Sequence, residues 1–199
     1  PRARRSLGIS LNCILYNEAP RVERMLQSVK GLVDEIVAIV DERTTDETAD
    51  IVRRYGGKVY FEPFRYSFSE LRNLAIERSS YLWIFVLDGD EYASDELKAN
   101  LRRLIETEDY DGYRFPRFNF HNPQVWPDKQ LRLFMCHGRW KYRVHEVVTG
   151  LRRVLDTPYV IYHDPRGKDR DLGPLYVELW EMDRREGLRR EPYPSRYRG

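Results

Sequence analysis

The sequence contains little cysteine, no large excess of either charge and no long apolar run. Its two cysteines, Cys13 and Cys136, show no C-x-x-C spacing and lie in apolar segments. This pattern is typical of buried free thiols in a reducing compartment and not of a disulfide framework. The formal net charge is only +2 over 199 residues, so the overall charge does not indicate a nucleic-acid-binding protein. No apolar run approaches the length of a transmembrane helix.

Glycine motifs that bind nucleotides are also absent. The sequence contains neither the G-x-x-x-x-G-K-[ST] motif of P-loop NTPases nor the G-x-G-x-x-G motif of dinucleotide-binding proteins. The acids after residue 87 do not form an EF-hand, because the third acid and the glycine are missing at the required offsets. A chain of this length forms one generous domain, or one domain with an appendage, and buries a core without disulfides.

The most informative stretch is an apolar run that ends on acids. Residues 81–87 are all apolar or aromatic, and Asp88-Gly89-Asp90-Glu91 follows, which predicts a strand buried on both faces of a parallel sheet. Residues i and i+2 of a strand point to the same side, so we expect Asp88 and Asp90 to share one ligand beside Gly89. Paired carboxylates favour a hard cation such as Mg²⁺ or Mn²⁺. The alternative is a solvated loop, because Asp-Gly is also ordinary turn chemistry.

Strand and helix patterns alternate through the first half of the chain. Apolar strands are expected at residues 8–16, 36–40, 58–64 and 81–87, with amphipathic helices between them and another helix from residue 95. Four such alternations predict an α/β fold with a wound, mostly parallel sheet flanked by helices. Ligands of these sheets bind beyond the carboxyl ends of the strands. Asn17, Asp41 and the Asp88–Asp90 acids all fall at those ends.

Two S/T-x-x-E patterns predict capping boxes at helix starts. Thr44 with Glu47 precedes the second expected helix, and Ser67 with Glu70 precedes the third. After Asp109 the pattern changes to short, aromatic-rich strands, including one over residues 140–148, and a helix is expected near Leu175. The sequence therefore predicts a smaller antiparallel half that follows the wound half.

Four segments in this order resemble those of family 2 glycosyltransferases of the GT-A fold. They are residues 9–18, residues 33–48, residues 68–75 and residues 83–91, the last with the D-x-D motif. Two further segments, Leu131-Arg132-Leu133-Phe134 and Arg143-Val144-His145-Glu146, are similar to a pattern of bacterial members of the lipopolysaccharide-core type. The resemblance implies a single GT-A domain over residues 1–199. Residues 8–110 would form the nucleotide-sugar-binding half, 111–170 the acceptor and catalytic half, and 171–199 a C-terminal helix and tail.

The resemblance implies an inverting hexosyltransferase that uses a nucleotide-diphosphate sugar, with a UDP-linked hexose as the expected donor. Glycosyl transfer expels a diphosphate, and a bound Mn²⁺ or Mg²⁺ stabilises its charge. The metal ligands would be Asp88, Asp90 and His163, although His163 could instead be a hydrogen-bonded histidine at a strand end. The donor-binding residues would be Leu15, Tyr16, Asn17, Glu18, Asp41, Arg72, Asp88 and Gly89.

Asp41 and Arg72 each have an alternative interpretation. The resemblance places Asp41 against the nucleotide base and Arg72 near the base or the phosphates. Asp41 could instead cap a helix, and Arg72 could be a solvated helical cation. Many family members have a Gly-Ser step after the second-strand acid, whereas this chain has Glu42-Arg43-Thr44.

Displacement at the anomeric carbon also needs a base that accepts the proton of the acceptor hydroxyl. Glu146 is the candidate and His145 its rival; because strand neighbours face opposite ways, only one of them is expected to face the site. The alternative for Glu146 is a strand-end carboxylate paired with Arg143. On the acceptor side, Gly138 would be a flexible glycine, and Trp140 and Trp126 would stack on a sugar, although large aromatics more often belong to the core.

The sequence leaves the acceptor open among a glycan, a lipid-linked sugar, a protein and a modified nucleic-acid base. Oligomeric state is not indicated. The expected location is cytoplasmic, with a peripheral position at the inner face of the membrane as the alternative. Two other functions compete with the transferase. A nucleotidyltransferase uses related sheets and paired acids but needs a glycine-rich, basic loop that Leu15-Tyr16-Asn17-Glu18 does not supply. A non-catalytic module that binds sugars or polyanions is the other.

Overall fold

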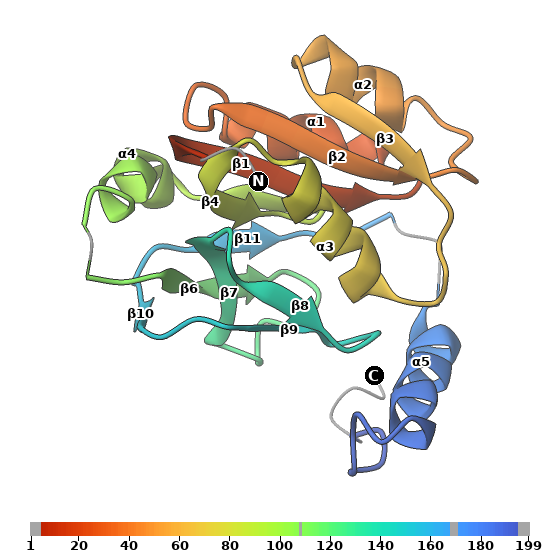
Figure 1. Ribbon diagram of the computed structural model, residues 1–199. Helices are drawn as coiled ribbons and strands as arrows, with labels where there is room; N and C mark the ends of the chain where they lie inside the picture. Colours follow the sequence, from red (N-terminus) through yellow and green to blue (C-terminus); the bar gives the residue numbers. More distant parts are fainter. Residues whose placement is uncertain (1–4, 108, 168–170, 195–199) are drawn as a thin grey trace.

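The computed structural model describes residues 5–107, 109–167 and 171–194. The C-terminal tail at 195–199 and the boundary expected at residue 170 lie outside the described residues. Helices and strands follow the expected alternation (Figure 1). The strands are β1 (Ser6–Leu15), β2 (Glu35–Asp41), β3 (Lys58–Glu62), β4 (Tyr81–Val86), β5 (Glu91–Ala93), β6 (Gly112–Asn119), β7 (Asp128–Met135), β8 (Arg139–Lys141), β9 (Val147–Thr149), β10 (Val154–Asp156) and β11 (Ile161–His163). The helices are α1 (Ala19–Ser28), α2 (Thr48–Arg54), α3 (Phe68–Arg78), α4 (Asp95–Leu104) and α5 (Gly173–Arg185).

The two expected halves share one mixed sheet. In the described part of the chain, nine strands form this sheet in the order β3-β2-β1-β4-β7-β6-β11-β5, with β10 paired to β6. Strands β3, β2, β1 and β4 run parallel, whereas β7 is antiparallel to both β4 and β6. The prediction of an α/β fold with a mostly parallel sheet is confirmed. The second half continues the wound half directly, because β7 pairs with the central strand β4. The expectation that this half is antiparallel is wrong in part, because β6 pairs parallel with both β10 and β11.

The central strands are buried on both faces, as their continuous apolar sequence predicts. In β1, Leu11 and Cys13 pack on the side of α1, whereas Ile14 packs on the side of α3. Adjacent residues of β4 divide in the same way, with Phe85 in the α1 cluster and Ile84 in a smaller cluster beneath Trp140. Helix α3 therefore covers the face of the sheet on which β8 also lies (Figure 1).

The prediction of a capping box is confirmed for α3 and wrong for α2. Ser67 caps α3 as predicted, because its side chain accepts a hydrogen bond from the Glu70 amide. Helix α2 begins only at Thr48, and the side chain of Asp46 accepts from the Thr48 amide. Thr44 is half-buried, and its buried hydroxyl has no hydrogen-bond partner among the described residues. An acid two residues before the helix performs the role expected of Thr44.

The single strand expected at residues 140–148 is a hairpin. Strands β8 and β9 pair antiparallel, and residues 142–146 form an irregular loop between them. Tyr142 and His145 have φ values of 77° and 46°, which residues with side chains rarely adopt. Alternation along a strand therefore does not decide which way His145 and Glu146 face. No helix in the described ranges is long and apolar enough to cross a membrane.

Candidate active site

The acids of the D-x-D motif form a turn and not the end of a strand. Strand β4 ends at Val86, and the Glu91 amide donates to the Asp88 carbonyl at 2.9 Å to close a turn into β5. The i, i+2 geometry of a strand therefore does not apply, and the carboxylates of Asp88 and Asp90 bind different partners. Gly89 is needed in this turn, because a Cβ there would lie 2.8 Å from Cγ of Glu18.

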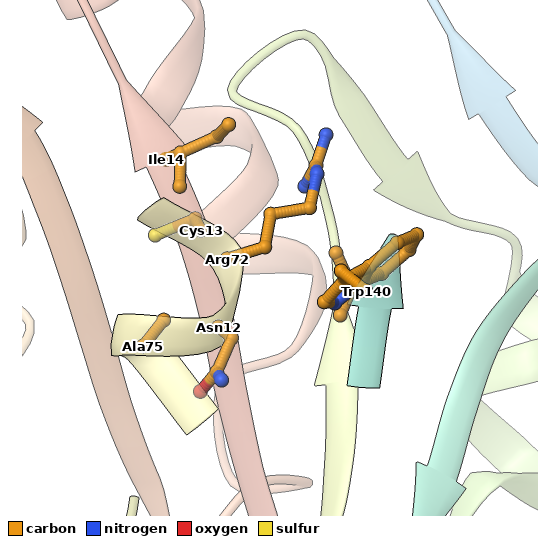
Figure 2. A pocket seen from close by; sticks show the side chains of 7 residues that line it. Asn12, Cys13, Ile14, Arg72, Ala75 and Trp140 are labelled. Atoms are coloured by element: carbon orange, nitrogen blue, oxygen red, sulfur yellow. The ribbon is translucent and has the colours of Figure 1, made fainter. Parts of the chain in front are cut away.

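Arg72 joins the two halves of the candidate site. From α3 its Nη2 donates to Asp88 Oδ1 at 2.9 Å, and its Nε donates to Glu146 Oε1 at 2.8 Å. Its guanidinium lies 5.1 Å from the centroid of the Trp140 ring (Figure 2). Burial by itself lowers the pKa of Arg72, but the charges of Asp88 and Glu146 outweigh that effect and raise the pKa. Arg72 is thus a buried cation between two acids, not the solvated helical cation of the alternative interpretation.

A second layer of ion pairs lies behind Asp88. Arg132 of β7 donates to Asp88 Oδ2 at 3.2 Å and to Glu91 Oε1 at 2.6 Å. Arg117 of β6 also reaches Glu91 Oε1, at 3.3 Å, and Glu91 accepts from the Asp88 amide at 3.0 Å. Arg132, Arg117 and Glu91 are not among the site residues predicted from the sequence. The signal that identifies Arg132 is a charged residue inside the apolar run Leu131–Phe134, since a buried arginine needs an acid partner.

Asp90 and His163 meet at the same edge of the sheet. The Asp90 carboxylate lies 3.1 Å from Nε2 of His163, and Asp90 is almost fully buried. Nδ1 of His163 is buried and has no hydrogen-bond partner among the described residues. Within those residues, no group of three or more His, Cys, Asp or Glu side chains is arranged to hold a metal ion. The expected three-ligand set is therefore not assembled, because Asp88 faces the arginines.

The Asp90–His163 pair nevertheless fits a divalent cation of the expected kind. Mg²⁺ and Mn²⁺ are bound by oxygen ligands, commonly by one or two protein groups with substrate phosphates and water completing the shell. The Asp90 carboxylate is one such oxygen ligand, and the imidazole of His163 beside it would add one nitrogen ligand. The unpartnered ring nitrogen of His163 is consistent with a histidine whose hydrogen bonds are incomplete without a ligand.

Glu146 and His145 face in opposite directions. Glu146 points to Arg72, whereas His145 packs among Tyr176, Trp180 and Tyr193, and its Nε2 lies 3.2 Å from the Tyr193 hydroxyl. Of the two candidate bases, only Glu146 lies beside Asp88 and Arg72. Arg143, the partner of Glu146 in the alternative interpretation, binds Asp183 and Glu186 instead.

The turn after β1 lies against the D-x-D turn. Glu18 is buried, forms a 2.8 Å ion pair with Arg21 and contacts Gly89. Asn17 has a φ of 50°, and its side chain accepts from the Thr45 amide at 2.9 Å. The Leu15 side chain belongs to the hydrophobic core, so only its backbone is available at this edge. The structure thus brings Asn17 and Glu18 to the site but turns Leu15 inward.

Asp41 is bound by Arg43, which lies where many family members have a Gly-Ser step. Arg43 donates to both carboxylate oxygens of Asp41, at 2.9 and 2.6 Å, and its guanidinium lies 5.5 Å from the Tyr16 ring centroid. The capping alternative for Asp41 is not what the structure shows, because α2 begins at Thr48 and Asp46 binds its first turn. A nucleotide base that approaches Asp41 meets Arg43 and Tyr16.

The three expected acceptor residues lie in different surroundings. Gly138 is a packing position, because a Cβ there would lie 2.9 Å from Val148 and 3.0 Å from Phe134. Trp140 is half-buried under Arg72 and packs on Phe134, so the ring face beside Arg72 is not free for a sugar. Trp126 is 48% exposed and contacts Phe118. Trp126 alone presents the exposed aromatic surface expected of an acceptor residue.

A narrow crevice lies beneath the Arg72 side chain, with no room for a molecule the size of water. Its walls include Cys13, Ala75 and Trp140 (Figure 2). Burial raises the pKa of the Cys13 thiol to about 12, so this cysteine is a protonated core residue and not a nucleophile. Cys136 is also a free thiol but is only half-buried.

Comparison with known proteins identifies the family. A model described as glycosyl transferase family 2 matches residues 13–163. The SPbeta prophage-derived glycosyltransferase SunS of Bacillus subtilis is 29% identical over 167 residues, which cover 78% of this chain and 39% of SunS. An uncharacterized glycosyltransferase of Rickettsia felis is 34% identical over 110 residues, 53% of this chain and 36% of that protein. The chain thus spans less than half the length of these curated relatives.

Solved structures share the fold. S. aureus TarS 1–349 in complex with UDP-GlcNAc superposes with a TM-score of 0.62 at 15% identity, over 92% of this chain and 66% of TarS. Glucosyl-3-phosphoglycerate synthase of Mycobacterium tuberculosis, in complex with Mn²⁺, UDP and glucosyl-3-phosphoglycerate, superposes with a TM-score of 0.60 at 16% identity. This match covers 94% of this chain and 81% of the synthase. Identities this low compare the folds alone.

Proposed function

Since the chain belongs to glycosyl transferase family 2, we propose that it transfers a hexose from a UDP-linked donor to an acceptor hydroxyl with inversion at the anomeric carbon. The observation that carries this proposal is the Arg72 bridge, in which one buried guanidinium holds both Asp88 and Glu146. These acids come from segments far apart in the sequence. Their meeting at the carboxyl edge of the parallel strands supports a site where donor and acceptor chemistry combine.

Glu146 is the proposed general base. It accepts the proton of the acceptor hydroxyl while the oxygen attacks the anomeric carbon from the side opposite the diphosphate. The new bond forms between that oxygen and the sugar, and the bond to the diphosphate breaks with its electron pair. The ion pair with Arg72 fixes the orientation of the Glu146 carboxylate, which favours proton transfer in a defined direction.

The proposed metal ligands are Asp90 and His163, which would hold Mn²⁺ or Mg²⁺ with the donor. The ion would neutralise the negative charge that develops on the departing diphosphate. Arg72 and Arg132 hold Asp88 beside this position, and each has a buried N–H without a hydrogen-bond partner among the described residues. Such donors suit an anionic ligand. Asn17, Glu18, Tyr16 and Asp41 are proposed to line the nucleotide position.

The acceptor remains a choice among a glycan, a lipid-linked sugar, a protein and a nucleic-acid base. Trp126 is the proposed acceptor aromatic, because its ring is exposed and aromatic faces pack against sugar rings. Assignment to the lipopolysaccharide-core type stays a prediction, which an acceptor assay with truncated lipopolysaccharide would test. A cytoplasmic location, or a peripheral one at the inner face of the membrane, stays a prediction as well.

Donor binding and turnover test the proposal separately. Isothermal titration with UDP, GDP and dTDP in the presence of Mn²⁺ should show binding of UDP. UDP-glucose or UDP-N-acetylglucosamine should then be hydrolysed slowly with release of UDP. Glu146→Gln should lower that rate about 100- to 10,000-fold and leave the UDP affinity within twofold. Pyrophosphate release from nucleoside triphosphates would instead indicate a nucleotidyltransferase, and no nucleotide binding at all would indicate a non-catalytic module.

A further inference from the structure

The loop that carries Glu146 is held from behind by α5. Residues 142–145 face this helix and the segment after it, whereas Glu146 faces Arg72. Helix α5 lies beside the β8–β9 hairpin and away from the main sheet (Figure 1). Its contacts with the loop therefore hold the loop on the side opposite Arg72.

Asp183 is the centre of these contacts. It lies in the last turn of α5 and is fully buried. Its Oδ2 accepts from the Arg143 amide at 2.9 Å and from Arg189 Nε at 3.3 Å, and its Oδ1 accepts from Arg143 Nη1 at 3.1 Å. Glu186 adds two bonds of 2.9 Å to the same Arg143 guanidinium. A buried carboxylate between two guanidinium groups holds them firmly in place, because removing either partner leaves a buried charge unpaired.

Arg189 links Asp183 to the backbone of the loop. Its guanidinium lies 3.9 Å from the Tyr142 ring centroid and 3.8 Å from that of Trp180. Its Nη2 donates to the carbonyl of Val144 at 2.5 Å and to that of His145 at 3.1 Å. The loop is thus held by its carbonyl groups, directly before Glu146.

The backbone that is held in this way is strained. Tyr142 and His145 have φ values of 77° and 46°, a region that residues with a Cβ avoid. Such a conformation persists only where surrounding contacts determine it. Because the backbone at His145 is left-handed, the side chains of His145 and Glu146 point in different directions. The imidazole lies against α5, and the Glu146 carboxylate lies against Arg72. The Phe68 amide, at the start of α3, also binds the Arg143 carbonyl at 3.0 Å.

We propose that Asp183 is a positioning residue for Glu146. Through Arg143 and Arg189 it keeps the loop in the left-handed conformation that directs the Glu146 carboxylate into the site. This inference rests on the proposed base role of Glu146. It assigns a part in catalysis to α5, which lies entirely beyond the part of the chain matched by the family model.

The test compares Asp183→Asn with Arg184→Gln, a control on the same helix whose side chain binds the exposed Glu181. The probe reaction is Mn²⁺-dependent hydrolysis of UDP-glucose and UDP-N-acetylglucosamine, with UDP affinity measured separately by titration calorimetry. Asp183→Asn should lower kcat about 10- to 100-fold and leave KM and the UDP affinity within twofold. Arg184→Gln should change none of these. Equal kcat in Asp183→Asn and wild type, at matched folded concentration, would overturn the proposal.

A double-mutant cycle separates this proposal from the base role itself. In a Glu146→Gln background, Asp183→Asn should lower kcat by less than about twofold, because the residue acts through Glu146. A full additional loss in that background would overturn the positioning role. If Glu146→Gln alone leaves kcat unchanged, the base assignment fails instead. If Asp183→Asn does not fold, the same double-mutant cycle is measured with Tyr193→Phe. This substitution removes only the hydroxyl group beside His145.

Discussion

The two edges of the parallel strands both carry buried acids, but they use them differently. At the edge where β1, β2 and β4 begin, Glu35 accepts from the Ser10 hydroxyl at 2.6 Å and from the Ser80 amide and hydroxyl. Asp34 accepts from the Ile9 amide at 2.8 Å and from Arg102. Glu35 also pairs with Lys58 at 2.8 Å. The partners at this edge are thus backbone groups and serine hydroxyls together with two long side chains, Lys58 and Arg102. Acids at this edge join neighbouring strands.

At the opposite edge the acids are held mainly by long side chains. Asp88 binds Arg72 and Arg132, and Glu91 binds Arg132 and Arg117. Arg72 and Arg132 also retain buried N–H groups that have no hydrogen-bond partner in the described ranges. Guanidinium groups change partners more readily than backbone amides and bind phosphate well. Burial of an acid therefore does not by itself distinguish the two edges; their partners do, with guanidinium groups predominating beside Asp88 and Glu91.

The largest effect is expected from Arg72→Met, which leaves Asp88 and Glu146 without their shared cation. Breaking a buried ion pair from one side costs about 3 kcal/mol of unfolding free energy, and donor hydrolysis should be lost as well. Urea unfolding followed by circular dichroism measures the first effect. The matched control is Arg78→Met on the same helix, an exposed arginine over the Tyr60 ring, which should cost about 0.5 kcal/mol. Equal losses in both variants would contradict the bridging role of Arg72.

A smaller effect is expected from Asp90→Asn, which tests the metal ligands at the same edge. The variant should need about tenfold more Mn²⁺, or more, to reach half-maximal enhancement of UDP binding, because the carboxylate charge is lost. Titration calorimetry over a series of Mn²⁺ concentrations measures this shift. Asp128→Asn, which removes an acid that pairs with Arg117 further along the sheet, is the control. An unchanged Mn²⁺ requirement in Asp90→Asn would exclude Asp90 as a ligand.

At the other edge, Glu35→Gln should change stability without changing hydrolysis. Burial raises the pKa of Glu35, but its hydrogen bonds with Lys58, Ser10 and Ser80 outweigh that effect and lower it. The stabilisation is therefore complete above the ordinary glutamate pKa of about 4.3 and is lost as the pH falls through the lower folded-state value. Wild type should exceed the variant by about 1 kcal/mol at neutral pH.

The difference between Glu35→Gln and wild type should disappear in acid, which urea unfolding at several pH values would measure. Glu106→Gln, at an exposed position after α4, should change stability little at any pH. A loss of stability in Glu35→Gln that does not depend on pH would show that the charge of Glu35 contributes nothing. A loss of hydrolysis would show that the two edges are not independent.

The smallest effect concerns the two thiols. Cys13, with a pKa raised to about 12 by burial, should react far more slowly with a disulfide reagent than the half-buried Cys136. Thiol titration of the native protein should show one fast group, and Cys136→Ser should abolish that phase. In guanidinium both thiols should react. Equal native rates for both thiols would contradict the burial of Cys13.

Much of the fold was predictable from local patterns. The apolar run at residues 81–87 and the alternating helices identified the parallel strands, and Ser67 with Glu70 marked the start of α3. The errors lie where a few residues form a turn. Residues 140–148 have strand-like composition but bend at Tyr142 and His145, and Asp88–Asp90 leave the strand before the first acid. Backbone conformation at such positions depends on distant contacts, which a short pattern does not contain.

By itself, the sequence determined the parallel strands, the helices between them and the edge of the sheet at which the D-x-D acids lie, because apolar periodicity and strand direction follow from local chemistry. Only the tertiary structure decided the partners. In the folded chain Arg72 lies between Asp88 and Glu146, Arg43 binds Asp41, and His145 points toward α5. Asp41 and Arg43 are only two residues apart, but the other contacts join segments that meet only in the folded chain. Those contacts depend on packing and not on composition.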